Sequence, residues 1–438
     1  MRKYLSILLV ACVALTGMAV VTAAQSDVEC PSGNADLVIA AGAVGDELEL
    51  LKSSLAAYEE LCPNVNATAL ETPDLATDRL GLYIQFLGAR SSAVDVYSVD
   101  VIWPAIVAEH MVDLYEYFPA DSETVSQHVP ALIENNTVED RLIAMPWYVD
   151  TGLLYYRTDL LEKYGFDAPP TTWDELESQA LTIMEGERAE GNSSFQGYVW
   201  QGALGEATTV NGLEWQASEG GGIIVTGDGE VQVNNDETID AVERAAGWVG
   251  SISPAEVIAH GVEDSRSIWQ SGNSAFMRNW SYAYSLGNSD NSPIQGLFDL
   301  APLPSGQDRV AATLGGWNLA VSQYSANPEA AVSLVQFLTS AEQQKFRALE
   351  QGFNPTVLSV YEDPDIQDAS PQFGQLFETL ESGSAVARPS TVAGDRYNDV
   401  SRLYANAVHS VLTGENDARI ALDDLEFELE DLVIELGY

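Results

Sequence analysis

A carboxylate, Asp100, lies near the end of the segment 93–104, which has the sequence AVDVYSVDVIWP. The β-branched and largely apolar run 94–101 is typical of a strand that is covered on both faces, and Trp103-Pro104 ends it. Open α/β sheets bind ligands at the carboxyl ends of their strands, so Asp100 is placed to accept hydrogen bonds from a ligand in a crevice. The alternative is that it caps a helix that begins near Pro104.

The elements that must position this carboxylate alternate between strands and helices. Strands are predicted at 37–41, 65–70 and 94–99, and helices at 46–61 and 75–89. Further along, the sequence predicts extended segments at 141–146, 152–157, 275–284 and 316–321, and helices at 237–249, 328–350 and from residue 372 onward. The initial βαβαβ order predicts an α/β fold with a mostly parallel sheet.

The N-terminus has the three parts of a secretory signal peptide. Met1-Arg2-Lys3 is basic, residues 4–21 are apolar and residues 22–24 are small, so residues 1–24 are predicted to be cleaved. Residues 9–12, LVAC, resemble a bacterial lipoprotein processing site, and a lipid anchor on Cys12 is therefore the alternative. Both routes predict a periplasmic or extracellular location.

Two cysteines, Cys30 and Cys62, would remain in the mature chain. In an oxidising compartment two such cysteines pair by default, so a structural disulfide is predicted. The four histidines are scattered without the spacing of metal ligands, and we expect neither a metal nor another cofactor.

The formal net charge is −47, from 66 acidic and 19 basic residues. Such a charge disfavours nucleic acid and anionic membranes as partners. Since 46% of the residues are hydrophobic, the acidity indicates a solvated surface rather than disorder. The chain is also too long for one ordinary core, which predicts two domains.

A series of motifs, in order along almost the whole mature chain, resembles one family. The segment 145–161, MPWYVDTGLLYYRTDLL, is similar to the inter-lobe strand and following helix start of extracellular solute-binding proteins that serve ABC sugar importers. Shorter matches are found at 42–47, 89–92, 99–104, 277–284, 314–317, 352–355 and 387–389. Within this family the chain most resembles the trehalose/maltose-binding branch.

The resemblance implies a two-lobed periplasmic-binding-protein fold, with a ligand cleft between the lobes and crossover strands around Asp150 and Gly315 as the hinge. Lobe 1 is expected to comprise residues 36–148 and 316–356, and lobe 2 residues 149–315 and 357–438. The implied function is capture of an α-linked disaccharide of the trehalose/maltose type by lobe closure, and delivery to the permease subunits of an ABC importer. The protein would be a monomer and not an enzyme.

The resemblance also assigns the ligand-binding residues. Hydrogen bonds to sugar hydroxyls are assigned to Glu47, Arg79, Asp100, Asp150 and Arg388, with Tyr148 as a further candidate. Trp280, Tyr282 and Trp317 would stack on two sugar rings or wall them, and the backbone of Gly315 and Gly316 would approach the ligand closely. These residue types suit a pyranose, because its hydroxyl rim fits carboxylates and guanidinium groups and its C–H face fits an aromatic plate.

Several of these side chains have a structural alternative. Glu47 could be an ordinary acid in a first helical turn, and Trp317 a core aromatic. Arg79 could be an exposed helix residue that pairs with Asp78 or Glu71. Arg90 or Arg396 could take the place of Arg388.

Two other functions fit part of the pattern. Carboxylates beside aromatic residues also describe a glycoside-acting enzyme. Against it, Arg79 and Arg388 are expected to keep nearby carboxylates ionised, whereas a general acid needs a raised pKa. A sugar-sensing binding module would have the same fold and the same cleft.

Overall fold

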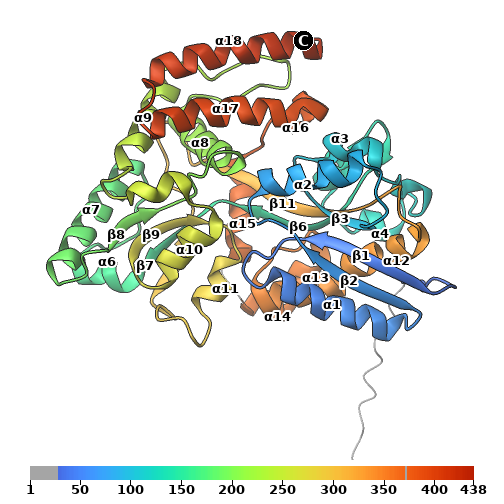
Figure 1. The fold of residues 1–438 in the computed structure, drawn as a ribbon. Helices are drawn as coiled ribbons and strands as arrows, with labels where there is room; N and C mark the ends of the chain where they lie inside the picture. The colour runs from blue at the N-terminus through green and yellow to red at the C-terminus, as the bar shows by residue number, and fades with distance from the viewer. Residues whose placement is uncertain (1–27, 370–371) are drawn as a thin grey trace, which may run out of the picture.

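Two sheets of different size organise the part of the chain that the structure describes, residues 28–369 and 372–438 of a computed structural model. We call the six-stranded sheet with its helices lobe 1, and the four-stranded sheet with its helices lobe 2. Figure 1 shows lobe 2 on the left and lobe 1 on the right. The predicted signal peptide, residues 1–24, and the alternative lipid site at Cys12 lie outside the described residues.

The core of lobe 1 is the βαβαβ unit that the sequence predicted. The strands, in sheet order, are β12 (Ala385–Val386), β11 (Ala312–Val321), β3 (Val96–Asp100), β1 (Ala35–Ala41) and β2 (Val65–Glu71), while β6 (Met145–Thr151) also pairs with β11. Strand β1 runs parallel to both β2 and β3. All residues of β3 are buried, as expected for a strand covered on both faces, and the strand ends at Asp100.

The sheet of lobe 2 is mixed. Its order is β10 (Phe298–Ala301), β7 (Leu153–Arg157), β9 (Ser274–Asn279) and β8 (Gln196–Val199). Strand β7 is antiparallel to β9 and β10, and only β8 and β9 are parallel. The expectation of a mostly parallel sheet is therefore right for β2, β1 and β3 and wrong for lobe 2. Strands β4 (Thr137–Val138) and β5 (Arg141–Leu142) form a separate pair.

Strands β6 and β11 connect the lobes. They are antiparallel, and Gly315 lies opposite Asp150 in their register. Only Gly152 separates β6 from β7, so the chain passes directly from the sheet of lobe 1 into that of lobe 2. Strand β11 also pairs with β3, where Trp317 lies opposite Asp100. The crossing strands thus bring residues from both lobes to one place.

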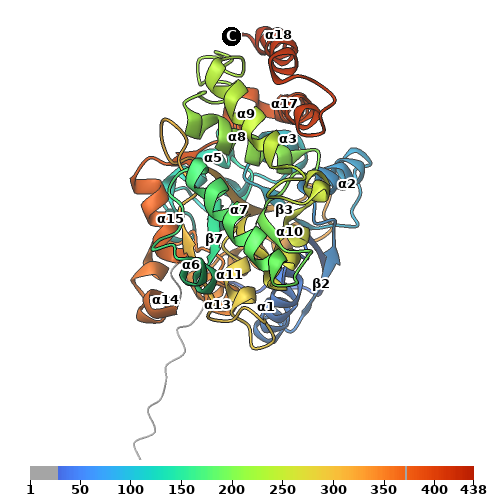
Figure 2. The ribbon, with the colours of Figure 1, turned by 90° about the vertical axis from the view of Figure 1, so that its left-hand side faces the viewer.

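Helices pack on both sheets (Figures 1 and 2). Lobe 1 carries α1 (Glu47–Leu61), α2 (Ala76–Gly88), α3 (Pro104–Val107), α4 (Glu123–Ser126), α5 (Pro130–Asn135), α12 (Pro328–Leu338), α13 (Ala341–Gln351) and α14 (Pro364–Ala369). Lobe 2 carries α6 (Thr158–Tyr164), α7 (Trp173–Ala189), α8 (Glu206–Glu219), α9 (Asp236–Trp248), α10 (Val262–Gln270), α11 (Ala283–Gly287), α16 (Ser390–Ala393), α17 (Tyr397–Leu412) and α18 (Ala418–Leu436). Helix α15 (Gln372–Glu381) lies against β6.

The lobe boundaries expected from the sequence remain predictions. Helix α14 contacts α13, whereas α17 contacts α8, α9 and α18. The chain after residue 357 therefore packs first on lobe 1 and then on lobe 2. Among the described residues, no helix is long and apolar enough to span a membrane.

Three predicted elements differ from the structure. The extended segment expected at 141–146 is divided between β5, which ends at Leu142, and β6, which begins at Met145. The single helix expected at 328–350 is two helices, because the Ser340 side chain accepts a hydrogen bond from the Gln343 N–H and starts α13. The strand expected at 275–284 ends at Asn279. Beyond it, the N–H of Ser281 donates to the Asp150 carboxylate at 3.2 Å instead of to a neighbouring strand.

The predicted disulfide between Cys30 and Cys62 is present, with 5.4 Å between the Cα atoms. Cys62 directly follows α1, and Cys30 precedes β1. The bond therefore ties the chain ahead of the first strand to the end of the first helix.

Candidate functional site

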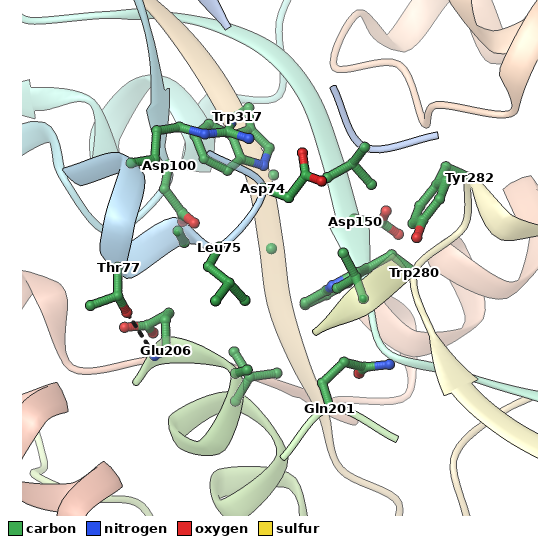
Figure 3. Close-up of a pocket in the computed structure, with 18 of the residues that line it drawn as sticks. Asp74, Leu75, Thr77, Asp100, Asp150, Gln201, Glu206, Trp280, Tyr282 and Trp317 are labelled. Atoms are coloured by element: carbon green, nitrogen blue, oxygen red, sulfur yellow. Dashed lines mark hydrogen bonds between the residues drawn. The ribbon is translucent and has the colours of Figure 1, made fainter. Parts of the chain in front are cut away.

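One cleft between the lobes is lined by every ligand-binding residue that the sequence predicted. Its empty space amounts to about 990 Å³, counting the part that opens to solvent. The predicted residues along it are Glu47, Arg79, Asp100, Tyr148, Asp150, Trp280, Tyr282, Gly315, Gly316, Trp317 and Arg388. Figure 3 shows Asp100 and Trp317 on one side of the cavity, and Glu206 and Gln201 on the other.

Glu47 and Tyr148 form a buried pair in the wall of lobe 1. Glu47 is the first residue of α1, and its side chain is almost completely buried. Its Oε1 accepts a hydrogen bond of 3.2 Å from the Tyr148 hydroxyl on β6. Burial raises the pKa of Tyr148 well above its usual value, so this hydroxyl stays protonated and donates. Glu47 is thus both a first-turn acid and a cleft residue.

Arg79 stacks on Trp317. The guanidinium carbon lies 4.1 Å from the centre of the indole, and Nε donates to the Pro73 carbonyl at 2.9 Å. Gly42 also lies against the guanidinium, and any side chain there would collide with it. Arg79 is only 1% exposed, so the alternative of an exposed helix residue is wrong. Trp317 also packs edge-on against Trp103, with 5.3 Å between ring centres.

Asp100 faces the cleft and does not cap a helix. Helix α3 begins after Trp103, and no side chain caps it in the part of the chain that the structure describes. The Asp100 Oδ1 instead accepts from Nη2 of Arg388 at 3.2 Å, and Nη1 of Arg388 donates to Glu206 at 2.8 Å. Because Asp100 belongs to lobe 1 and Glu206 to lobe 2, Arg388 bridges the lobes with a carboxylate on each side.

The alternatives to Arg388 lie elsewhere. Arg396 pairs with Asp399 and Glu435, and it does not line the cleft. Arg90 is exposed at the end of α2. Of the three candidates, only Arg388 is in the cleft.

Asp150 is buried on β6 and already has several donors. Its oxygens accept from the Thr151 N–H at 2.9 Å, the Ser281 N–H at 3.2 Å and the Ser281 hydroxyl at 3.0 Å. Burial nevertheless raises the pKa of Asp150 to about 7, against the lowering by these hydrogen bonds. Asp150 therefore joins the inter-lobe strand to the turn after β9.

Trp280, at the end of β9, repeats the stack of lobe 1. The guanidinium carbon of Arg278 lies 4.1 Å from the indole centre. Arg278 forms a buried ion pair with Glu214 on α8, with hydrogen bonds of 2.6 and 3.0 Å, and also donates to Gln201 at 3.2 Å. The same Glu214 carboxylate accepts from the Thr313 N–H on β11 at 3.0 Å. The ion pair therefore fixes Trp280 relative to the crossing strand.

Tyr282 lines the cleft with its ring, while its hydroxyl donates to Glu263 at 2.6 Å. Glu263 in turn accepts hydrogen bonds from Nε and Nη2 of Arg266. The hydroxyl therefore has a partner within lobe 2, and the aromatic face is what the cleft can use.

Contacts within the protein explain why both positions on β11 are glycine. Gly316 has φ +137°, and a Cβ there would lie 2.5 Å from the Tyr148 carbonyl oxygen. A Cβ on Gly315 would lie 2.8 Å from the Trp280 ring. These contacts explain both glycines without a ligand.

Sequence reasoning did not name Glu206, Arg278, Asp74 and Gln201, which line the cleft, or Glu214, which pairs with Arg278. Arg278 lies within the motif 277–284 and two residues before Trp280 on a predicted strand, so its position on the same face could have been inferred. Glu206 and Glu214 are on α8, for which the sequence analysis predicted no element.

One argument against an enzyme is weaker than expected. Arg79 and Arg388 were expected to keep the cleft carboxylates ionised, but burial raises the pKa of Asp100 despite the opposing charge of Arg388. Burial also raises the pKa of Asp150, to about 7. The choice between enzyme and binding protein therefore depends on the comparison with known proteins.

A sequence model of the family described as bacterial extracellular solute-binding proteins matches residues 43–345. A probable ABC transporter-binding protein of Deinococcus radiodurans is 45% identical over 417 residues, which are 95% of this chain and 97% of that protein. The structure of maltose-bound T. maritima MalE3 has a TM-score of 0.85 at 37% identity, over 91% of this chain and 100% of that one. A solute-binding protein of Thermotoga lettingae bound to α-D-tagatose has a TM-score of 0.81 at 25% identity, over 92% and 100% of the chains.

Proposed function

The chain belongs to the family of bacterial extracellular solute-binding proteins, and we propose that it captures an α-linked disaccharide of the trehalose/maltose type for an ABC importer. As a member of this family it is a binding component and not an enzyme. In this proposal the protein is a secreted monomer that releases its sugar to the permease subunits at the membrane.

The observation that carries the proposal is the pair of tryptophans, one from each lobe, beside charged groups in one cleft. Trp317 and Trp280 offer apolar plates to two rings, while Glu47, Asp100 and Arg388 offer partners for hydroxyls. A relative of 37% identity, whose whole length this chain covers, was solved with maltose bound. The disaccharide is preferred over a polyol because two separate plates suit two rings.

Lobe closure is the proposed signal to the permease. A ligand that contacts both lobes binds the closed form more tightly than the open form, and so shifts the population toward closure. Arg388 already joins Asp100 of lobe 1 to Glu206 of lobe 2. The expected hinge is the crossing pair β6 and β11, and the lobe boundaries predicted from the sequence are part of this proposal.

Calorimetry of the purified protein against disaccharides, polyols and a peptide tests the proposal. We expect the tightest binding for an α-linked glucose disaccharide. Glu47→Gln should weaken that binding about tenfold, because a neutral amide replaces a charge-assisted acceptor. The matched control is Glu59→Gln on the same helix, whose carboxylate accepts from the Ala67 N–H at 2.8 Å.

Three results would contradict the proposal. One is the absence of heat with every sugar in the panel. A second is tighter binding of the peptide or of a polyol than of any disaccharide. The third is equal sugar affinity in Glu47→Gln and Glu59→Gln, which would remove Glu47 from the site.

A further inference from the structure

Both tryptophans of the cleft have a guanidinium on one face. Arg278 lies 4.1 Å from the centre of Trp280, and Arg79 lies 4.1 Å from the centre of Trp317. The two stacks come from different lobes and from residues far apart in the sequence. A ligand that stacks on either indole therefore has only the opposite face available.

The cations in these stacks are fixed. Arg278 is 1% exposed and paired with Glu214, which is also 1% exposed. Arg79 is 1% exposed, donates to the Pro73 carbonyl and lies against Gly42. Contacts within the protein therefore hold both guanidinium groups on the indoles.

We propose that Arg278 and Arg79 are specificity-determining residues that keep cationic ligands off the tryptophan faces and reserve the cleft for uncharged carbohydrate. This inference rests on the proposed function, since it concerns what the same cleft selects. An indole face attracts a cation through its quadrupole, so a bare tryptophan would also bind ammonium groups. A second cation on the opposite face would lie about 8 Å from the guanidinium, which at an effective dielectric constant of about 20 weakens binding of that cation about 30-fold. The buried carboxylate of Glu214 offsets most of this repulsion at Arg278, so the larger effect is expected at Arg79.

The rest of the molecule makes such exclusion useful. A net charge of −47 attracts cations of every kind toward the surface. The cleft itself contains five carboxylates, Glu47, Asp74, Asp100, Asp150 and Glu206. Without the stacked arginines, an amino sugar or a quaternary ammonium compound would find both a negative field and two open aromatic plates.

The test compares a neutral disaccharide with the same disaccharide in which one hydroxyl is replaced by an amino group, using two positional isomers. Calorimetry gives the ratio of their Kd values in wild type and in Arg79→Met. Arg79 has no ion-pair partner among the residues that the structure describes, so this variant removes the charge without leaving a paired carboxylate behind. The matched control is Arg188→Met on α7, an arginine outside the cleft whose Nε also donates to a backbone carbonyl, that of Phe195, at 2.8 Å.

We expect the preference for the neutral disaccharide to fall about tenfold or more in Arg79→Met and to stay unchanged in the control. If wild type binds no amino sugar, detectable binding in the variant is the expected gain. A ratio within threefold of wild type, or an equal fall in the control, would overturn the inference. Arg79→Lys, which keeps the charge, should retain the preference, and an equal fall in Arg79→Lys and Arg79→Met would also overturn it.

Failure of the proposed function can be told apart from failure of this inference. Tetramethylammonium chloride, titrated against tryptophan fluorescence at constant ionic strength, probes the indole faces without any sugar. A response that is stronger in Arg79→Met than in wild type supports the inference even if no disaccharide binds. Equal responses in wild type and variant contradict it even if disaccharides bind.

Discussion

The two walls of the cleft carry the same stack of a guanidinium on a tryptophan but hold it differently. In lobe 2, Arg278 has a buried carboxylate partner, Glu214, and a further hydrogen bond to Gln201. In lobe 1, Arg79 donates to the Pro73 carbonyl, and its Nη1 has no hydrogen-bond partner among the residues that the structure describes. One wall therefore depends on an ion pair and the other on packing.

This difference separates recognition from stability. A stack held by packing can lose its arginine without leaving a charge behind, whereas a stack held by a buried ion pair cannot. Lobe 1 has a different reinforcement, the disulfide between Cys30 and Cys62 near the far end of α1. Substitutions in the two walls should therefore have unequal effects on folding even where they have similar effects on binding.

The largest expected effect follows from breaking the ion pair. Arg278→Met should lower the free energy of unfolding by about 3–5 kcal/mol, because it leaves Glu214 buried and unpaired. Arg79→Met should cost only about 1 kcal/mol, since a single backbone carbonyl loses its donor. Urea unfolding followed by circular dichroism measures both values. Equal losses in the two variants would show that the walls are held alike.

Asp150 lies on β6, the strand between the two walls, and it should make the stability of the protein depend on pH. Asp150 has a raised pKa, about 7 when folded against about 3.9 when unfolded, so between these values the folded state binds the extra proton. Its contribution to stability is complete below about pH 4 and is lost as the pH rises to about 7, by at most about 4 kcal/mol. The measurement is the free energy of unfolding from pH 4 to pH 8 in wild type and Asp150→Asn.

Because other groups also titrate in this range, the difference between the two profiles is the quantity of interest. Wild type should lose stability relative to Asp150→Asn as the pH rises. Parallel profiles would mean that Ser281 and Thr151 keep the carboxylate ionised in the folded protein.

The disulfide gives the corresponding test for lobe 1. It closes a loop with a sequence separation of 32, for which the chain-entropy model gives a stabilisation of about 3–4 kcal/mol. Cys30→Ser/Cys62→Ser should therefore unfold at lower urea concentration, with sugar affinity within about twofold of wild type. A large loss of affinity at full folding would instead connect this end of α1 to the position of Glu47.

The family resemblance assigned the cleft residues, and most of them lie at ends or crossings of strands. The apolar pattern also predicts the strands of Asp100, Trp280 and Trp317, but it left Asp150 between the extended segments 141–146 and 152–157. Glu206 has no such signal, because it meets Arg388 only in the folded chain, 182 residues apart in sequence. Tertiary partners of this kind cannot be read from local pattern.

The fold was predictable to a similar extent. The βαβαβ unit follows from alternation alone, but the antiparallel pairing of β7 depends on how the chain returns from lobe 1. The break between α12 and α13 was missed because the helical pattern continues across it, and a single serine cap decides the boundary. The raised pKa of Asp100 was missed because burial outweighs the charge of Arg388, and burial is not visible in a sequence.

The two tryptophans can be compared directly through their contributions to binding of the disaccharide with the highest affinity. Trp280→Ala should weaken it by about 2 kcal/mol through lost stacking and burial, because Glu214 and Gln201 keep Arg278 in place. Trp317→Ala should cost about 3 kcal/mol, since Arg79 then loses the ring that holds it in position. A double-mutant cycle by calorimetry separates these terms: Trp317→Ala with Arg79→Met should show coupling, and Trp280→Ala with Arg278→Lys little. Equal coupling in both cycles would mean that the two walls recognise the sugar in the same way despite their different anchoring.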